Sequence, residues 1–321
     1  MSEPALTLFP EITPYDSNWL EVGGNHAIYY EQCGNPEGYP VVFLHGGPGS
    51  GCNPTQRRFF DPSFYRIVLL DQRGCGRSKP MGAIDDNNTD ALVGDIELLK
   101  HHLNIQQWLV FGGSWGSTLG LAYAIKYPLS VTGLILRGIF LSRVQELDWF
   151  LNDVNFFFPE AHQALKAYLP AEEQNDVLKA YTKRVFADDM DIASEAAKHW
   201  NSYENSIMSL LPRTPSANTP ITPADIEVAR ARVQIHYILN QCFVGQRDLI
   251  ADAKTLANVP TTIIQGRYDM VCPPMTAWDL KSAMPHADFH MIPDAGHSAM
   301  EINVTAALVQ ATENFKRAQI K

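Results

Sequence analysis

The stretch WLVFGGSWGSTLGLAYAIKYP, residues 108–128, passes from a short apolar run through a glycine-rich turn into a helical pattern. Trp108–Phe111 predicts a strand, and Ser117–Tyr127 predicts a helix that ends before a proline. The turn between them, residues 112–116, is a G-x-S-x-G motif. Between a strand and a helix, such a turn lifts the serine hydroxyl clear of the sheet, and its glycines allow close helix packing. Ser114 is therefore the candidate nucleophile.

Other apolar runs on both sides of this stretch extend the same pattern. Near-continuous hydrophobicity predicts strands that are covered on both faces, as in a parallel sheet. Thr89–Leu103 predicts a helix, with Thr89 as its expected N-cap, and Trp19–Gln32 predicts a hairpin around two glycines. This alternation predicts a mostly parallel, doubly wound α/β fold. The expected strands are Val41–Leu44, Tyr65–Leu70, Trp108–Phe111, Val131–Leu136, Thr261–Ile264 and Phe289–Ile292.

The alternation stops within residues 141–245, where the sequence is helical and amphipathic. A loop rich in Pro, Ser and Thr, LPRTPSANTPITP at 211–223, divides this segment. About a hundred residues is more than a connection between two strands requires. We therefore expect a helical cap over residues 141–245, inserted between two parts of the core, 1–140 and 246–321. A helical decoration that only buries apolar surface is the alternative.

A serine hydroxyl needs a base, and the base needs a group that orients it. Asp269 follows the expected strand in TTIIQGRYD, and His297 follows the one in FHMIPDAGH. Both would lie just past strand ends, where side chains can converge on Ser114, and the order Ser, Asp, His is that of the α/β-hydrolase fold. Asp279 and Asp294 are rival acids, and His286 and His290 lie nearby. Asp279 lies in a helical pattern and Asp294 is too near His297 in sequence, so Asp269 is preferred.

The segment HGGPGSGCN, residues 45–53, leaves an expected strand almost without side chains. Acyl transfer through a tetrahedral oxyanion needs two backbone N–H groups aimed at the developing charge. One would come from Trp115, the residue after the nucleophile, and the other from the loop after the third strand. We expect Gly47 to supply the second amide.

Composition excludes several classes of function. The 321 residues carry a formal net charge of −10, which argues against a nucleic-acid or anionic-membrane partner and is compatible with a substrate amine. The five cysteines are scattered and form no C-x-x-C pair, so no zinc or redox signature appears and free thiols are expected. Neither a secretory signal nor a membrane span is recognisable. We expect a cytoplasmic protein.

Several motifs together resemble the proline iminopeptidase (prolyl aminopeptidase) family of α/β-hydrolase-fold serine peptidases. The resemblance spans nearly the whole chain and implies release of N-terminal proline from short peptides, with no metal or organic cofactor. In that family the cap supplies a proline pocket and acidic residues for the amine. The motifs are HGGPG, DQRGCGRSKP at 71–80, GGSWGSTLGLAYAIKYP at 112–128, GRYDMVCP at 266–273, and AGHS at 295–298.

The resemblance carries over to the cap in part. Family members have a segment like W-x-x-W-E, which WNSYE at 200–204 matches with tyrosine as the second aromatic residue. Glu204 would then meet the substrate ammonium. Where the family tends to have an acidic residue, in a stretch like ARxENHY, this chain has ARVQIHY and therefore Gln234. Losing one carboxylate should weaken amine binding or loosen the preference for a free N-terminus.

Two further positions, Arg137 and Phe140, match family positions that line the proline pocket; an ordinary salt bridge and core packing are their alternatives. Cys272, three residues after Asp269, is expected near the site. The same machinery acting on another small amide or ester stays open because of Gln234, as does a homo-oligomer formed through the cap. A non-catalytic binding protein of this fold would be expected to lack one of the three catalytic side chains, and none is missing.

Overall fold

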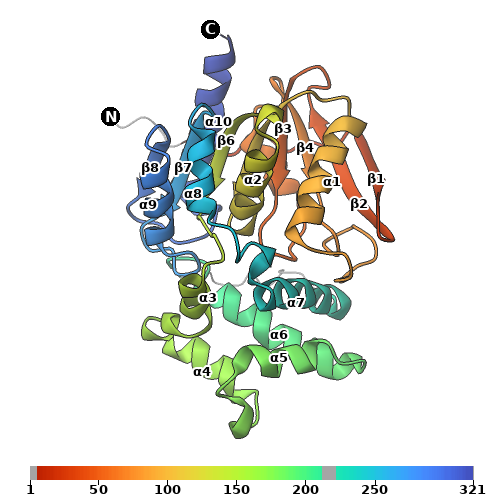
Figure 1. Cartoon of the computed structure of the whole chain (residues 1–321), viewed down its shortest axis with the longest axis vertical. Coiled ribbons are helices and arrows are strands. Elements are labelled where there is room, and N and C mark those ends of the chain that lie inside the picture. The colour runs from red at the N-terminus through yellow and green to blue at the C-terminus, as the bar shows by residue number, and fades with distance from the viewer. Residues whose placement is uncertain (1–5, 212–221, 321) are drawn as a thin grey trace.

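The centre of the molecule is a twisted, mostly parallel sheet (Figure 1). The computed structural model describes residues 6–211 and 222–320, and within them the sheet has eight strands in the order β1-β2-β4-β3-β5-β6-β7-β8. β1 and β2 form an antiparallel hairpin, β2 is antiparallel to β4, and every later pair is parallel. The strands are β1 (Asp16–Gly23), β2 (His26–Gly34), β3 (Tyr39–Leu44), β4 (Tyr65–Leu70), β5 (Trp108–Gly113), β6 (Val131–Arg137), β7 (Thr261–Gly266) and β8 (Asp288–Ile292).

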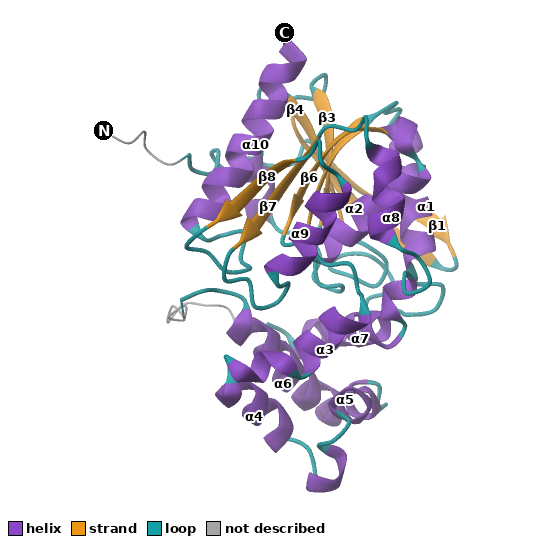
Figure 2. Ribbon diagram, turned by 60° about the vertical axis from the view of Figure 1, so that its left-hand side comes forward, coloured by secondary structure: helices purple, strands orange, loops and turns teal. Residues whose placement is uncertain are grey.

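Helices cover both faces of this sheet (Figure 2). Successive side chains of a strand point to opposite faces, so Val42 and Leu44 of β3 pack with the helices of one face while Val41 and Phe43 pack against the other. The prediction of a mostly parallel α/β sheet is thus confirmed. The helices of the first face are α1 (Thr89–His102), α2 (Trp115–Lys126), α8 (Leu249–Ala253) and α9 (Pro274–Ala283), and α10 (Ile302–Ile320) lies on the second with the short helix Pro54–Phe59.

Two helix starts differ from the sequence-based expectation. The N-cap of α1 is Asn88, whose side chain accepts a hydrogen bond from Ala91 N at 3.0 Å. Thr89 is already helical, and its hydroxyl donates instead to the Cys242 carbonyl oxygen. α2 begins at Trp115, directly after the serine, because the sharp turn at Ser114 leads straight into the helix.

A separate group of helices lies below the carboxyl ends of the parallel strands (Figure 1). These helices have an apolar core of their own, in which Phe150, Leu165, Tyr181 and Trp200 are buried. We call this group the cap helices; they are α3 (Val144–Leu151), α4 (Pro159–Ala167), α5 (Val177–Val185), α6 (Met190–Ile207) and α7 (Ala224–Leu239).

Hydrogen bonds connect the cap helices to loops that follow strands β4 and β7 of the sheet. Tyr237 of α7 donates to Asn87 Oδ1 at 2.8 Å, and Trp149 Nε1 of α3 donates to the Met270 carbonyl at 2.8 Å. Most of the loop expected at 211–223 lies outside the described residues. Among the helices of the described chain, none combines the length and the apolar character that crossing a membrane demands.

Candidate functional site

Ser114 occupies the sharp turn between β5 and α2. Its backbone has φ 57° and ψ −129°, a region that non-glycine residues seldom adopt and that is retained mainly where function needs it. A Cβ at position 116 would collide with the Leu44 carbonyl oxygen at the end of β3. The glycine there lets α2 start against the sheet, which holds the Ser114 side chain at the carboxyl ends of the strands.

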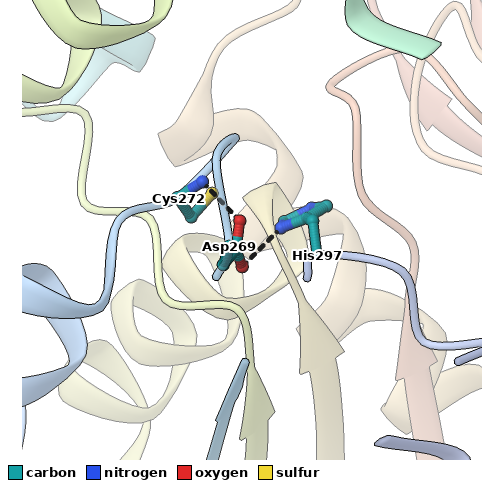
Figure 3. Close-up of side chains that lie close together, drawn as sticks. All are labelled: Asp269, Cys272 and His297. Atoms are coloured by element: carbon teal, nitrogen blue, oxygen red, sulfur yellow. Dashed lines mark hydrogen bonds and ion pairs between the residues drawn. The ribbon is translucent and has the colours of Figure 1, made fainter. Parts of the chain in front are cut away.

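Asp269 and His297 form a buried pair at the ends of β7 and β8 (Figure 3). His297 Nδ1 and Asp269 Oδ2 are 2.8 Å apart, and the two side chains are 3% and 1% exposed. Asp269 Oδ1 also accepts from the backbone N–H groups of Val271 (3.0 Å) and Cys272 (2.8 Å). These contacts fix the carboxylate, so His297 carries its proton on Nδ1 and presents Nε2 as the acceptor.

The rival groups lie elsewhere. Asp279 pairs with Arg143 at 2.8 Å, and Asp294 accepts a hydrogen bond from Asn303 at 2.7 Å. His290 is exposed beside Asp288, and His286 contacts the Val259 carbonyl. None of these contacts involves Ser114.

The Nε2 atom of His297 faces Arg137. Arg137 Nη1 donates to Nε2 at 3.2 Å and to the His297 carbonyl oxygen at 2.8 Å. Within residues 6–211 and 222–320, no hydrogen bond joins Ser114 Oγ to His297. The lone pair that would take the serine proton is therefore directed at a guanidinium in this structure.

The loop after β3 crosses in front of the serine. Gly47 lines the same cavity as Ser114, and its φ of 112° is one that a side chain would strain. Trp115 is the first residue of α2, so its N–H has no acceptor within the helix. The two candidate oxyanion amides therefore come from different segments: that of Gly47 from the glycine-rich loop after β3, and that of Trp115 from the start of α2.

Gln72, which sequence reasoning missed, connects these two segments. Its side-chain Nε2 donates to the His45 carbonyl at 2.9 Å, and its Oε1 accepts from Trp115 Nε1 at 2.8 Å. Its neighbour Asp71 accepts from Cys52 N at 2.6 Å, and Arg77 binds the same carboxylate at 2.7 Å. The motif DQRGCGRS, at the end of β4, therefore holds the loop after β3 in place. The position of this motif directly after a strand was the sequence signal that could have predicted this role.

A small, partly open cavity, which we call the cap cavity, lies between Ser114 and the cap helices. Side chains of α3, α6 and α7 line it, and its walls are mainly apolar. Phe140 is among them, as is the buried Cys272, whose thiol pKa is raised well above its ordinary value by burial. The lining residues are Gly47, Pro48, Ser114, Phe140, Leu147, Phe150, Glu204, Gln234, Ile238, Val271 and Cys272.

Glu204 and Gln234 are the buried polar side chains of this cavity. Gln234 Nε2 donates to Glu204 Oε1 at 2.9 Å, while Gln234 Oε1 accepts from Trp200 Nε1 at 2.6 Å. The indole therefore fixes the amide so that its NH₂ faces the carboxylate. The other oxygen, Oε2, pairs with Arg230 Nη2 at 2.6 Å.

Arg230 is the second residue that sequence reasoning missed. It lies one helical turn before Gln234 on α7, and residues four apart share a helix face. This spacing was a usable signal once Gln234 was placed at the site. The ion pair with Glu204 leaves this end of the cap cavity formally neutral.

Arg137 does not line the cap cavity. It borders a second cavity, of about 280 Å³, whose lining includes Gly46 and Gly113 beside the Ser114 turn. The structure thus brings Ser114, Gly47, Phe140 and Glu204 to one cavity and places Arg137 between His297 and another.

One group of described side chains has the composition of a metal site. Single ligand atoms of Asp269, Cys272 and His297 all lie within 4.8 Å of one another. A thiol must lose its proton to bind a metal, and burial opposes that loss for Cys272. Asp269 Oδ2 already contacts His297 Nδ1 at 2.8 Å. These residues therefore fit an acid–base pair better than a metal centre.

Comparison with known proteins identifies the family. The model of the alpha/beta hydrolase fold family matches residues 39–304. Solved structures with 17–19% identity share the fold: an esterase from Exiguobacterium antarcticum (TM-score 0.60, 94% of this chain and 100% of that chain) and 2-hydroxy-6-oxo-6-phenylhexa-2,4-dienoate hydrolase from Rhodococcus (TM-score 0.60, 95% and 99%).

Curated sequences are much nearer. A probable proline iminopeptidase of Leptolyngbya boryana is 47% identical over 96% of both chains, and a proline iminopeptidase of Xylella fastidiosa is 47% identical over 96% of this chain and 99% of its own. That of Arabidopsis thaliana is 46% identical over 97% of this chain and 82% of its own. The chain belongs to the proline iminopeptidase family of α/β-hydrolase-fold proteins.

Proposed function

We propose that this protein is a serine exopeptidase that releases proline from the N-terminus of short peptides. One observation carries the proposal: Ser114 and the buried carboxylate Glu204 line a single small cavity. An apolar pocket with few, fixed polar groups is typical of a small-molecule site. The names of the curated relatives agree with this activity.

The proposed reaction has two halves. Ser114 Oγ attacks the scissile carbonyl carbon while His297 Nε2 takes the hydroxyl proton, and the Gly47 and Trp115 amides bind the resulting oxyanion. The C–N bond then breaks as His297 returns the proton to the leaving nitrogen. Water, deprotonated by His297, attacks the prolyl ester, and Ser114 leaves with the proton as free proline is formed.

Glu204 would determine that only the terminal residue is cleaved. With the scissile carbonyl at Ser114, the substrate nitrogen points toward the cap helices, where a carboxylate favours an ammonium. Phe140 and Phe150 supply apolar walls for the pyrrolidine ring. A longer N-terminal extension would meet the side chains of α3, α6 and α7 that line the cavity.

The Glu204–Arg230 ion pair supports a second candidate function, the hydrolysis of a small amide or ester. A carboxylate that is already neutralised and hydrogen-bonded by Gln234 attracts an ammonium less strongly. The same machinery would then act on a small amide or ester without a charged amine.

A panel of arylamides separates the two functions. We expect release of arylamine from prolyl-arylamide, a lower kcat/KM for alanyl-arylamide, and none from N-acetyl-prolyl-arylamide. Ser114→Ala should lower kcat by about 10⁴-fold or more, whereas Asp279→Asn, outside the site, should leave it unchanged. Equal cleavage of the acetylated substrate would favour the second function, and full activity of Ser114→Ala would refute both.

A further inference from the structure

The cavity that borders Arg137 shares no lining residue with the cap cavity. We call it the leaving-side cavity, and its volume is about 280 Å³. Gly46 and Gly113 form its border with the serine turn. Its walls combine aromatic side chains, such as Phe43 and Phe59, with the polar side chains of Asn53 and Gln56.

Arg137 is the only arginine among the residues that line this cavity, and no aspartate or glutamate lines it. No carboxylate of the described residues lies within 4.0 Å of Arg137, and both of its hydrogen bonds run from Nη1 to His297. A guanidinium has five N–H donors in a fixed fork. Arg137 is only partly buried, and its Nε and Nη2 donors make no hydrogen bond with the described residues, so they remain for an anion from outside.

The backbone leaves room for this guanidinium. A Cβ at position 113 would lie 2.5 Å from Arg137 Nη2 and 2.9 Å from both Cζ and Nε. The second glycine of the nucleophile motif therefore lets the guanidinium lie beside the turn that carries Ser114. Its place next to the reacting groups depends on that glycine.

The reaction determines what arrives there. His297 Nε2 must give its proton to the leaving nitrogen, so this nitrogen lies beside Nε2, and Nε2 is 3.2 Å from Arg137 Nη1. In an amino acid the N–Cα and Cα–C bonds are about 1.46 and 1.52 Å. The carboxyl carbon of the leaving residue therefore lies about 2.5 Å from its nitrogen, within reach of the guanidinium.

We propose that Arg137 binds the free α-carboxylate of the leaving residue, that the side chain of this residue enters the leaving-side cavity, and that prolyl dipeptides are therefore the preferred substrates. The proposal rests on the exopeptidase function above and names its substrate class. A carboxylate also accepts the Nη1 donor that otherwise occupies His297 Nε2. The correct substrate thereby frees the lone pair for the proton of Ser114.

The test compares two substrates with one scissile bond: prolyl-alanine and prolyl-alanine amide. They share the N-terminus and differ in the negative charge. We expect kcat/KM to favour the free acid by roughly tenfold or more, the size of one charge-assisted contact, mainly through KM. In Arg137→Gln the ratio should fall to about one, Arg137→Lys should restore part of it, and Arg66→Gln, at the far end of β4, should leave it unchanged.

If the Arg137→Gln variant is inactive, its kinetics cannot be compared. Substrate binding is then measured in a variant that does not turn the substrate over. In a Ser114→Ala background, calorimetry should show tighter binding of prolyl-alanine than of its amide, and the added Arg137→Gln change should remove the difference. Equal kinetics or equal binding of the acid and the amide in the presence of Arg137 would overturn the proposal. Cleavage of prolyl-arylamide with no acid preference refutes this inference alone, whereas no cleavage of any prolyl substrate refutes the exopeptidase function as well.

Discussion

At the residue scale, three side chains determine the charge around Glu204 in the cap cavity. Glu204 supplies one negative charge, Arg230 neutralises it, and Gln234 donates to it without adding charge. Under the proposed function, a substrate ammonium would compete with the Arg230 guanidinium that already pairs with Oε2. This competition would set the affinity for a free N-terminus.

Replacing Arg230 by methionine tests this competition. The change keeps an apolar side chain of similar length and frees Glu204 Oε2, so we expect KM for prolyl-arylamide to fall by up to about tenfold, with kcat nearly unchanged. Steady-state kinetics at constant ionic strength measure both constants.

Arg232→Met is the matched control because Arg232, on the same helix, donates to the carbonyls of Val185 and Ala187 instead. It should leave KM unchanged. A higher KM in Arg230→Met would show that Arg230 positions Glu204 rather than competing with the substrate.

At the element scale, the loop after β3 depends on neighbouring segments for its shape. His45 begins this loop and is 1% exposed. Its Nε2 accepts from Gln72 N at 3.0 Å, and its Nδ1 contacts the Gly46 carbonyl at 2.9 Å. The neutral imidazole thus bridges two strand ends.

This neutral histidine should make folding stability depend on pH. Burial lowers the pKa of His45 below its ordinary 6.5, with the charge of Asp71 opposing the shift. Below pH 6.5 the unfolded chain binds a proton at this position that the folded chain does not, so His45 lowers stability as the pH falls toward the folded pKa. The loss is at most about 1.4 kcal/mol per pH unit.

The variant His45→Gln removes this titration. In urea denaturation at a series of pH values, the wild type should exceed the variant by a constant amount above pH 7, and the difference should shrink below pH 6.5. Parallel stability curves from pH 7.5 to 5.5 would contradict the assignment of a neutral, buried imidazole.

At the scale of the whole molecule, two apolar cores meet at the site. The helices on one face of the sheet form the first, and the cap helices form the second; a further core lies on the opposite face of the sheet. The cap cavity lies where they meet, so its shape depends on both. Residues deep in the cap core support the fold without touching the cavity.

Leu165→Ala separates stability from binding. Leu165 of α4 is 1% exposed in the cap core and does not line the cap cavity. Its truncation should lower the free energy of unfolding by about 2–5 kcal/mol, while kcat/KM for prolyl-arylamide stays within about twofold below the transition. Denaturation and kinetics on one preparation measure both.

Phe150→Ala is the informative comparison, because Phe150 belongs to the same core and also lines the cavity. It should lower both stability and kcat/KM. Equal losses of kcat/KM in the two variants would mean that the cap core and the cavity are not separable.

Sequence patterns predicted the sheet because buried parallel strands are continuous apolar runs, and the Asp269 and His297 positions followed from their places at strand ends. The orientation of side chains was not predictable in the same way. Arg137 ends β6 beside His297, but only the twist of the sheet decides which cavity its guanidinium enters. The N-cap at Asn88 rather than Thr89 is a choice between adjacent capping residues that tertiary contacts decide.

The lining of the cap cavity has a consequence for how such a peptidase coexists with other proteins. Under the proposed function, the side chains of α3, α6 and α7 that line the cavity would limit cleavage to a free N-terminus, which the interior of a folded polypeptide does not offer. The shape of the cavity would then itself protect folded proteins from cleavage.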